Sequence, residues 1–218
     1  MSVAVLDRTL RFPDPRRANP DGLVAIGGDL SVGRLLLAYQ TGIFPWTVDP
    51  ITWWSPDPRG IFEFDAFHVP HSLRKVLARN FFRITRDQAF RDVIEKCAAP
   101  APGRRETWIS REFIDAYTKL HERGHAHSLE CWHGEDLAGG IYGVAVGGCF
   151  VGESMFHRAS NASKVALYYL VQHLHERGFE LFDIQMLTPV TRQLGAQLIP
   201  REEYLRRLAK AVKLSALF

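Results

Sequence analysis

The stretch LAGGIYGVAVG (residues 137–147), followed by CFVGESMF (residues 149–156), decides the fold of this 218-residue chain. Both segments carry β-branched and aromatic residues, which favour strands, and glycines separate the two segments. HSLECWH (residues 127–133) has the same character and precedes them. The sequence therefore predicts three strands in succession.

Further strands and amphipathic helices alternate on both sides of this block. The other expected strands are residues 60–65, 81–85 and 180–187. The expected helices are residues 71–79, 87–97, 110–123 (with Ser110 as its cap), 162–176 and 201–212, and residues 99–106 are expected to form a loop. The predicted fold class is α+β, close to α/β in its order of elements, with a mixed sheet flanked by helices.

Residues 1–60 differ from the rest of the chain in composition. They contain the turn-dense segments FPDP, NPDGL, IGGDL, GIFPW and WWSPDPR, with one clear helical stretch at residues 32–40. We therefore expect a small N-terminal domain over residues 1–60 and a larger domain over residues 61–218.

The composition restricts the class of protein. Apolar residues make up 46% and charged residues 23% of the chain, which is typical of a globular protein. The sequence has no apolar stretch long enough for a membrane-spanning helix and no secretory signal at its N-terminus. Its three widely spaced cysteines fit a reducing compartment, and a buried, unreactive state is expected for them. We expect a cytoplasmic protein, and a monomer.

Charge is distributed unevenly along the chain. Residues 70–111 hold ten Lys and Arg against four acids, whereas residues 112–199 hold six bases and ten acids. This pattern favours a polyanion on one surface and a cation near another, although two solvated faces would give the same pattern.

The sequence contains a pattern that matches a zinc-binding motif but is not expected to bind zinc. His121-Glu-Arg-Gly-His125 matches H-E-x-x-H, but Gly124 is expected to end the helix before the second histidine. The run Leu-His-Glu-Arg-Gly recurs at residues 174–178, again between a helix and a strand. Both copies are interpreted as helix ends, and no metal site is expected.

Polar residues in predicted strands are the candidates for chemistry. Asp183 and Gln185 alternate with Ile184 and so are expected to share one face, where the carboxylate accepts the Gln185 amide N–H. Glu153 lies among apolar residues and is a candidate to receive a cation. A structural hydrogen-bonded pair and a satisfied structural acid are the alternatives.

Two further patterns suggest binding. Ser160-Asn-Ala-Ser-Lys164 precedes a predicted helix, where its side chains serve as caps or the helix start binds an anion. Tryptophans stand beside Gly, Pro and Ser residues, at positions 46, 53, 54 and 108. They suit the stacking of nucleobases, or else a core at a domain junction.

Taken together and in order, the motifs FPDP, GLVAIGGDL, GIFPW, WWSPDPR, TWI, GHAHS, GGIYGVAVG, GESMF, NASK, DIQ, LGA and IPREEYL resemble the bacterial leucyl/phenylalanyl-tRNA–protein transferases. The resemblance runs from about Phe12 to Leu205. It implies transfer of leucine or phenylalanine from aminoacyl-tRNA to the N-terminal Arg or Lys of acceptor proteins, which marks them for N-end rule degradation. It also implies a GNAT-like (N-acetyltransferase-type) second domain and no metal or organic cofactor.

The resemblance also implies roles for individual residues. Asp183 orients Gln185, whose carbonyl helps to draw the proton from the attacking amine, and Glu153 binds in the substrate site. The pocket for the transferred side chain is expected from Phe150 and Met155, with Leu170 and Leu174 as neighbours, and Trp46 and Trp108 are expected around the tRNA 3′ adenosine. The candidates for tRNA phosphates are Arg79, Arg83, Arg86, Arg91 and Lys164. Val190 stands where relatives commonly carry His, so no imidazole is expected to act there.

Two other functions remain open from the sequence. A coenzyme A-dependent N-acetyltransferase would share the fold, but residues 158–163 lack the glycines of a pyrophosphate-binding loop. A non-catalytic tRNA-binding module would need the tryptophans and the basic segment, but neither Asp183 nor Gln185.

Overall fold

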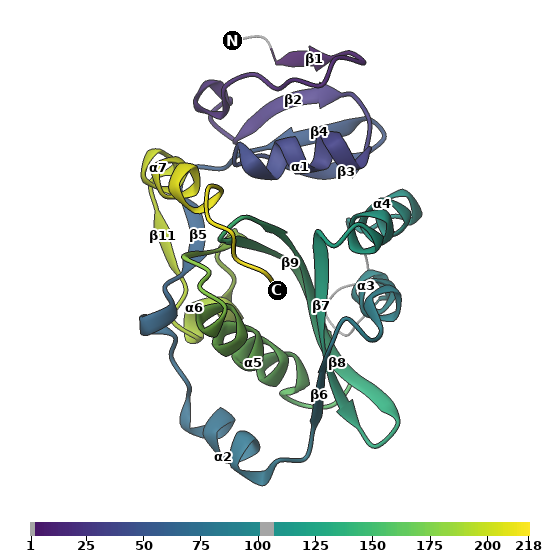
Figure 1. Ribbon diagram of the computed structural model, residues 1–218, viewed down its shortest axis with the longest axis vertical. Coiled ribbons are helices and arrows are strands. Elements are labelled where there is room, and N and C mark those ends of the chain that lie inside the picture. Colours follow the sequence, from purple (N-terminus) through teal and green to yellow (C-terminus); the bar gives the residue numbers. More distant parts are fainter. Residues whose placement is uncertain (1–2, 101–106) are drawn as a thin grey trace.

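The computed structural model describes residues 3–100 and 107–218, which form two β-sheets (Figure 1). The first sheet lies at the N-terminal end of the molecule, and its first two strands are parallel. In order across the sheet its strands are β1 (Ala4–Leu6), β2 (Leu23–Gly27), β4 (Ile51–Trp54) and β3 (Phe44–Val48).

The second sheet is mixed. From edge to edge its strands are β11 (Gln197–Ile199), β5 (Arg59–Phe62), β10 (Leu181–Gln185), β9 (Cys149–His157), β8 (Asp136–Val146), β7 (Ala126–His133) and β6 (Arg83–Arg86). Strands β9 and β10 are parallel, and the other neighbours are antiparallel.

Helices cover both faces of this second sheet. The α-helices in the described part of the chain are α1 (Val32–Gln40), α2 (His71–Arg79), α3 (Phe90–Ala98), α4 (Arg111–Glu122), α5 (Ala162–Glu176), α6 (Pro189–Gln193) and α7 (Arg201–Ala211). Helix α5 packs on one face, whereas α3 and α4 pack on the other (Figure 1). Helix α7 packs beside β10. The expected mixed sheet flanked by helices is confirmed.

Strands β9 and β10 separate at the place where the chemistry is expected. Their pairing runs from Cys149 opposite Leu181 to Val151 opposite Asp183 and continues no further. Register shifts interrupt the pairing of β9 with β8 near Glu153 and of β10 with β5 just after Asp183. Such β-bulges bend a strand and redirect its side chains, and they are frequent beside active sites.

The helices follow the predicted periodicity closely, and one helix start differs. The predictions for residues 32–40, 71–79 and 162–176 coincide with α1, α2 and α5. The helix expected from residue 87 begins at Phe90, because Asp87 has a φ of 55° and its carboxylate accepts the backbone N–H of Ser128.

The predicted cap positions are occupied, but their side chains do not bond to the helix backbone. Ser110 is the N-cap residue of α4, and its hydroxyl donates to Glu112 instead of accepting from the backbone of α4. At the start of α5, Asn161 has a φ of 65° and donates to Ser160, so neither side chain caps the helix.

Residues 1–60 hold more regular structure than expected, because four short strands accompany α1. The expected strand at residues 60–65 ends at Phe62 and is followed by a 3₁₀ turn at Phe64–Ala66. The buried core includes residues from both sides of residue 60, such as Trp53 and Val144. The division into two domains stays a prediction. Of the expected loop at 99–106, residues 101–106 lie outside the described part of the chain.

Other expectations concern helix ends and thiols. Helices α4 and α5 end at Glu122 and Glu176, and Gly124 and Gly178 follow with φ values of 74° and 78°, as predicted. All three cysteines are buried, as expected. No helix among the described residues has the length and apolar character needed to span a membrane.

Candidate active site

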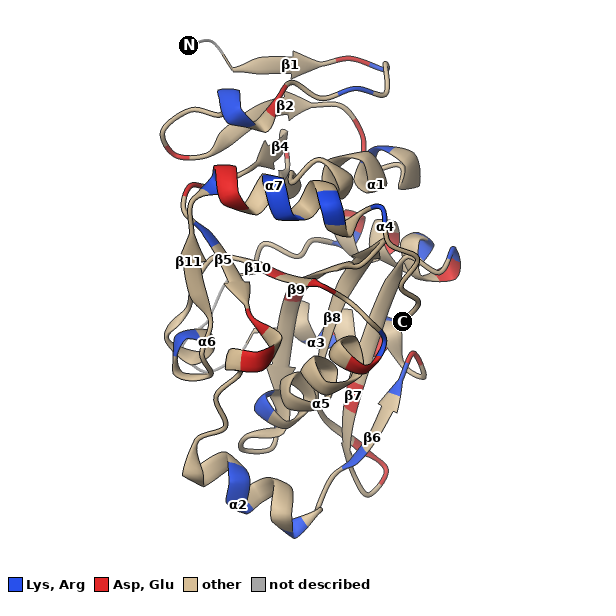
Figure 2. Cartoon of the chain, turned by 60° about the vertical axis from the view of Figure 1, so that its left-hand side comes forward, with Lys and Arg blue, Asp and Glu red and all other residues tan. Residues whose placement is uncertain are grey.

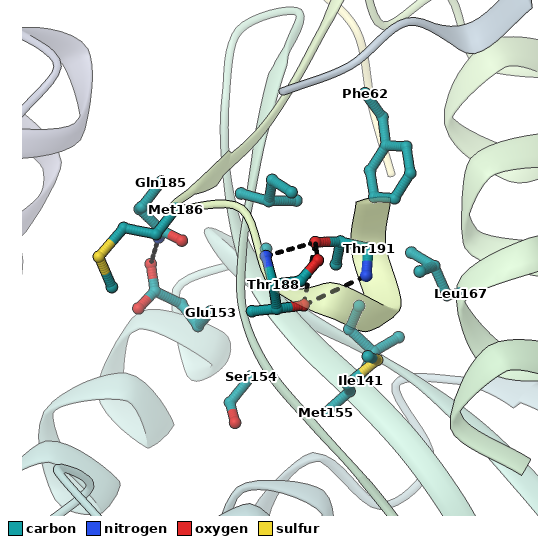
Figure 3. A pocket seen from close by; sticks show the side chains of 12 residues that line it. Phe62, Ile141, Glu153, Ser154, Met155, Leu167, Gln185, Met186, Thr188 and Thr191 are labelled. Atoms are coloured by element: carbon teal, nitrogen blue, oxygen red, sulfur yellow. Dashed lines mark hydrogen bonds between the residues drawn. The ribbon is translucent and has the colours of Figure 1, made fainter. Parts of the chain in front are cut away.

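Two cavities meet where β9 and β10 separate. The larger, of about 210 Å³, lies between α5 and the two strands, and its wall is mainly apolar (Figure 3). Its lining includes Phe62, Ile141, Met155, Leu167 and Ile184, with Ser154, Thr188 and Thr191 as polar members. The Thr188 and Thr191 hydroxyls are hydrogen-bonded to each other, so their polarity is partly satisfied within the wall.

The smaller cavity, of about 90 Å³, is aromatic. Its lining includes Phe44, Pro45, Trp46 and Trp108. Glu153, Gln185 and Met186 line both cavities. An apolar chamber and an aromatic chamber therefore adjoin at one carboxylate and one amide.

Glu153 is held by hydroxyl and amide donors. Tyr39 donates to its Oε1 atom at 2.8 Å, and Tyr117 donates to Oε2 at 3.3 Å. Gln185 Nε2 donates to Oε1 at 3.0 Å. The two tyrosine hydroxyls also lie in hydrogen-bond contact with each other, and because each carries one proton, a hydroxyl that donates to its neighbour does not donate to Glu153 at the same time. None of these hydrogen-bond partners is a cation, so no ion pair neutralises the carboxylate.

This environment changes the acidity of Glu153. Burial disfavours the ionised form and raises the pKa of its carboxyl to about 7, against the opposing effect of the tyrosine hydroxyls. Burial also raises the pKa of Tyr39 and Tyr117 well above the usual value, so both phenols stay protonated and continue to donate. A carboxyl with a pKa near 7 can exchange a proton with a substrate at neutral pH.

Asp183 has different partners from those predicted. Its carboxylate forms a fully buried bidentate ion pair with Arg59, at 2.8 and 2.6 Å, and accepts a hydrogen bond from Tyr204. It also accepts the backbone N–H of Gln185 at 2.8 Å. The expected bond from the Gln185 side-chain amide to Asp183 is therefore wrong, because the strand bends after Asp183 and Glu153 accepts that amide instead.

The residues predicted for the transferred side chain and for the tRNA 3′ adenosine separate into two groups. Met155 lines the larger cavity, and Trp46 and Trp108 line the smaller one. Phe150, expected in the wall of the pocket for the transferred side chain, lines neither cavity, and neither do Leu170 and Leu174, which were expected as neighbours of the pocket. Their side chains are buried in the core between α5 and the sheet, where Phe150 packs against Phe182.

The basic candidates lie away from both cavities. Figure 2 shows basic residues on α2 and β6, at the end of the molecule opposite β1. Arg79, Arg83 and Arg86 are exposed there, and the Arg79 and Arg83 guanidinium groups lie over the rings of Phe81 and Trp132.

The other two basic candidates differ in setting. Arg91 is engaged in ion pairs with Glu95 and Asp115, so it is less available than predicted. Lys164 is half-buried in the first turn of α5.

The first histidine of the motif that resembles a zinc site has a structural role. His121 stacks on Phe90 with ring centroids 4.4 Å apart, and its Nδ1 atom lies 2.9 Å from the carbonyl of Ala126. Within residues 3–100 and 107–218 there is no cluster of three His, Cys, Asp or Glu side chains suited to a metal ion.

Several residues at the site were not singled out from the sequence: Tyr39, Arg59, Tyr117, Met186 and Tyr204. Tyr39, Tyr117 and Tyr204 stand at buried positions of amphipathic helices, where a tyrosine needs a hydrogen-bond partner. An arginine directly before a buried strand, as in WWSPDPRGIF, is the corresponding signal for Arg59.

Comparisons with known proteins show the family to which the chain is similar. A family model described as leucyl/phenylalanyl-tRNA protein transferase matches residues 61–209, and one described as the N-terminal domain of that transferase matches residues 28–57. The curated leucyl/phenylalanyl-tRNA–protein transferase of Anaeromyxobacter sp. (strain K) is 50% identical over 98% of this chain and 93% of its own length.

Another curated protein and one solved structure also match the chain. The protein of the same name from Tolumonas auensis is 50% identical over 94% of this chain and 89% of its own length. Among solved structures, a GCN5-related N-acetyltransferase from Kribbella flavida matches with a TM-score of 0.42 and 11% identity, over 76% of this chain and 59% of that one.

Proposed function

Because the chain belongs to the leucyl/phenylalanyl-tRNA–protein transferase family, we propose that the two cavities are the site of aminoacyl transfer from tRNA to a protein. The observation that carries this proposal is the meeting of an apolar and an aromatic cavity at Glu153 and Gln185. The 3′ end of an aminoacyl-tRNA has matching parts: an apolar side chain, an ester carbonyl and an adenosine.

The larger cavity takes the leucine or phenylalanine side chain. Its wall offers hydrocarbon surface, so selection rests on burial and shape. Met155 is a deformable wall that suits both a branched chain and a flat ring. Charged side chains are excluded because they would lose water without gaining a partner.

The smaller cavity takes the terminal adenosine, with Trp46 and Trp108 as its aromatic walls. With the two ends of the substrate held in this way, the ester carbonyl lies near Glu153 and Gln185. The ester is already activated, so the protein acts mainly by holding the amine and the carbonyl in reacting geometry.

Glu153 and Gln185 then handle the amine. Because Gln185 Nε2 faces Glu153, the Gln185 carbonyl oxygen is left to accept a hydrogen bond from the incoming α-amino group. Glu153 takes a proton from the ammonium form, whose pKa is about 8. The nitrogen attacks the ester carbon, the bond to the ribose oxygen breaks, and that oxygen leaves with the second proton.

The rest of the acceptor protein and the body of the tRNA bind outside the two cavities. Acceptors with N-terminal Arg or Lys follow from the family resemblance. Arg79, Arg83 and Arg86 support contacts to tRNA phosphates, because all three are exposed and form no ion pair within the described residues. Such contacts would depend on salt and not on base sequence.

The test is transfer of labelled Leu or Phe from charged tRNA to peptides that begin with Arg, Lys, Asp or Ala. We expect transfer to Arg and Lys peptides, and a loss of at least about tenfold in Gln185→Ala with tRNA binding kept. Gln193→Ala, an exposed glutamine on α6, is the matched control and should transfer normally. Full turnover by Gln185→Ala, or acetyl transfer from acetyl-CoA instead, would contradict the proposal.

A further inference from the structure

A buried polar cluster lies behind the two cavities and lines neither of them. It consists of Arg59 on β5, Asp183 on β10 and Tyr204 on α7, and we call it the Arg59 cluster. All three side chains are at most 1% exposed. The guanidinium also lies over the Tyr204 ring, 4.4 Å from its centroid. Such a group has no route to substrate, so any effect on the reaction passes through other residues.

The Asp183 carboxylate has no acceptor position left for substrate. Each oxygen accepts two hydrogen bonds: Oδ1 from Arg59 Nε and the Gln185 N–H, and Oδ2 from Arg59 Nη2 and the Tyr204 hydroxyl. A carboxylate offers about four such positions, so the set is complete. Asp183 therefore acts on Gln185 through the backbone.

That contact holds Gln185 in an unusual conformation. Gln185 has a φ of 53°, in the left-handed region that side chains other than glycine seldom occupy. The N–H of Met186 bonds back to the carbonyl of Ile184, which closes a tight turn around Gln185. The bond from Asp183 Oδ1 to the Gln185 N–H stabilises this turn, and the turn directs the Gln185 amide to Glu153.

The Arg59 cluster also connects distant parts of the fold to this turn. Arg59 Nη1 donates to the carbonyl of Gly42, at the turn between α1 and β3, at 3.2 Å. Gly42 has a φ of 83°, and a Cβ atom there would lie 2.6 Å from Leu205 and 3.0 Å from Tyr204. Helix α7 and the first sheet are thus fitted closely around the ion pair.

We propose that Arg59 and Tyr204 are positioning residues for aminoacyl transfer, acting through Asp183 on the backbone of Gln185. This inference rests on the proposed function, since it needs Gln185 in the reacting site. It assigns the C-terminal helix α7 a part in the reaction that the cavities alone do not indicate.

The variant that tests it is Tyr204→Phe, which removes one hydroxyl and keeps the ring over Arg59. Tyr142→Phe is the matched control, because Tyr142 is equally buried and its hydroxyl has no hydrogen-bond partner among the described residues. We expect Tyr204→Phe to lower kcat about fivefold and to leave the KM for aminoacyl-tRNA unchanged, as for the loss of one hydrogen bond. Tyr142→Phe should leave both constants unchanged.

A double-mutant cycle shows whether the effect passes through Gln185. In the Gln185→Ala background, Tyr204→Phe should lower the residual rate no further. A full fivefold loss in that background, an unchanged kcat in Tyr204→Phe, or an equal loss in Tyr142→Phe would each overturn the proposal.

A second readout does not depend on activity. Hydrogen exchange of the Gln185 backbone amide, followed by NMR, should be faster in Tyr204→Phe than in the wild type and unaffected in Tyr142→Phe. If exchange responds in this way but the wild type transfers no amino acid, the proposed function fails and the positioning of the Gln185 backbone stands. If exchange is the same in all three proteins, the positioning role is wrong whatever the activity.

Discussion

Asp183 and Glu153 are carboxylates on neighbouring parallel strands, and their surroundings differ completely. Asp183 faces a guanidinium, and its acceptor positions are filled. Glu153 has hydroxyl and amide partners only and opens onto both cavities. The strand separation between them decides this difference, because β10 turns Asp183 toward α7 while the bulge in β9 turns Glu153 toward α1 and α4.

The difference teaches how one strand pair can supply both rigidity and reactivity. A buried, paired and fully hydrogen-bonded charge fixes the backbone around it. A buried carboxyl without a cation keeps a pKa near neutrality and can therefore exchange protons. The central claim is that Asp183 positions and Glu153 reacts.

The largest expected effect comes from removing the cation that is paired with Asp183. Arg59→Met leaves Asp183 buried without its cation, and we expect the free energy of unfolding to fall by about 3–5 kcal/mol. Urea unfolding followed by fluorescence measures it. Arg16→Met, which breaks the surface pair with Glu202, is the control and should leave stability unchanged. A loss below about 1 kcal/mol in Arg59→Met would contradict the account.

The stability that Glu153 contributes to the folded protein should depend on pH. The pKa of Glu153 is raised to about 7 from its ordinary value of 4.5, so its ionisation costs stability in the folded state. The stability it contributes is complete below pH 4.5 and is lost as pH rises through 7.

In Glu153→Gln the side chain cannot ionise, so the loss of stability with rising pH should be absent. Relative to the wild type, its stability should therefore rise between pH 4.5 and pH 8, by at most about 3 kcal/mol. Chemical unfolding at several pH values measures the difference. A constant difference across this range would show that Glu153 titrates normally.

A smaller effect should come from removing the Tyr39 hydroxyl, which donates to Glu153. The bond from Tyr39 stabilises the ionised form of Glu153, so Tyr39→Phe should raise the pKa of Glu153 further. We expect the pH–rate profile of transfer to move to higher pH by about half a unit to one unit. Tyr142→Phe is again the control, and a shift to lower pH in Tyr39→Phe would exclude this role.

A further effect concerns selection among donors. Met155→Ala should lower transfer of Leu and change the Leu:Phe ratio, since an apolar pocket distinguishes side chains by about 1–3 kcal/mol. Glu153→Gln should impair both donors similarly. Competition between Leu-tRNA and Phe-tRNA measures the ratio, and an unchanged rate and ratio in Met155→Ala would place the pocket elsewhere.

The helices and the central strands could be predicted because their signals are local. The apolar periodicity of residues 162–176 and the glycines at positions 124 and 178 set element bounds within a few residues. The strands of residues 1–60 could not be predicted, because they have three to five residues each, and β2 contains a glycine and β3 a proline. Their pairing comes from contacts across the fold.

The site could be predicted only as a set of residues, without its connections. Asp183, Gln185 and Glu153 were found from their strand positions. The partner of Asp183 is Arg59, 124 residues away along the chain, and no local pattern links the two. Strand alternation placed the Gln185 amide on Asp183. The structure places it on Glu153, because the left-handed turn at Gln185 ends that alternation.

The most direct test of the central claim is an NMR titration of the Glu153 side-chain carboxyl carbon in the wild-type protein, with Glu153→Gln to assign the signal. The account predicts a titration midpoint near pH 7, caused by burial without a cation in direct contact. A midpoint near 4.5 would show an ordinary solvated carboxylate. It would contradict the division of tasks between Asp183 and Glu153.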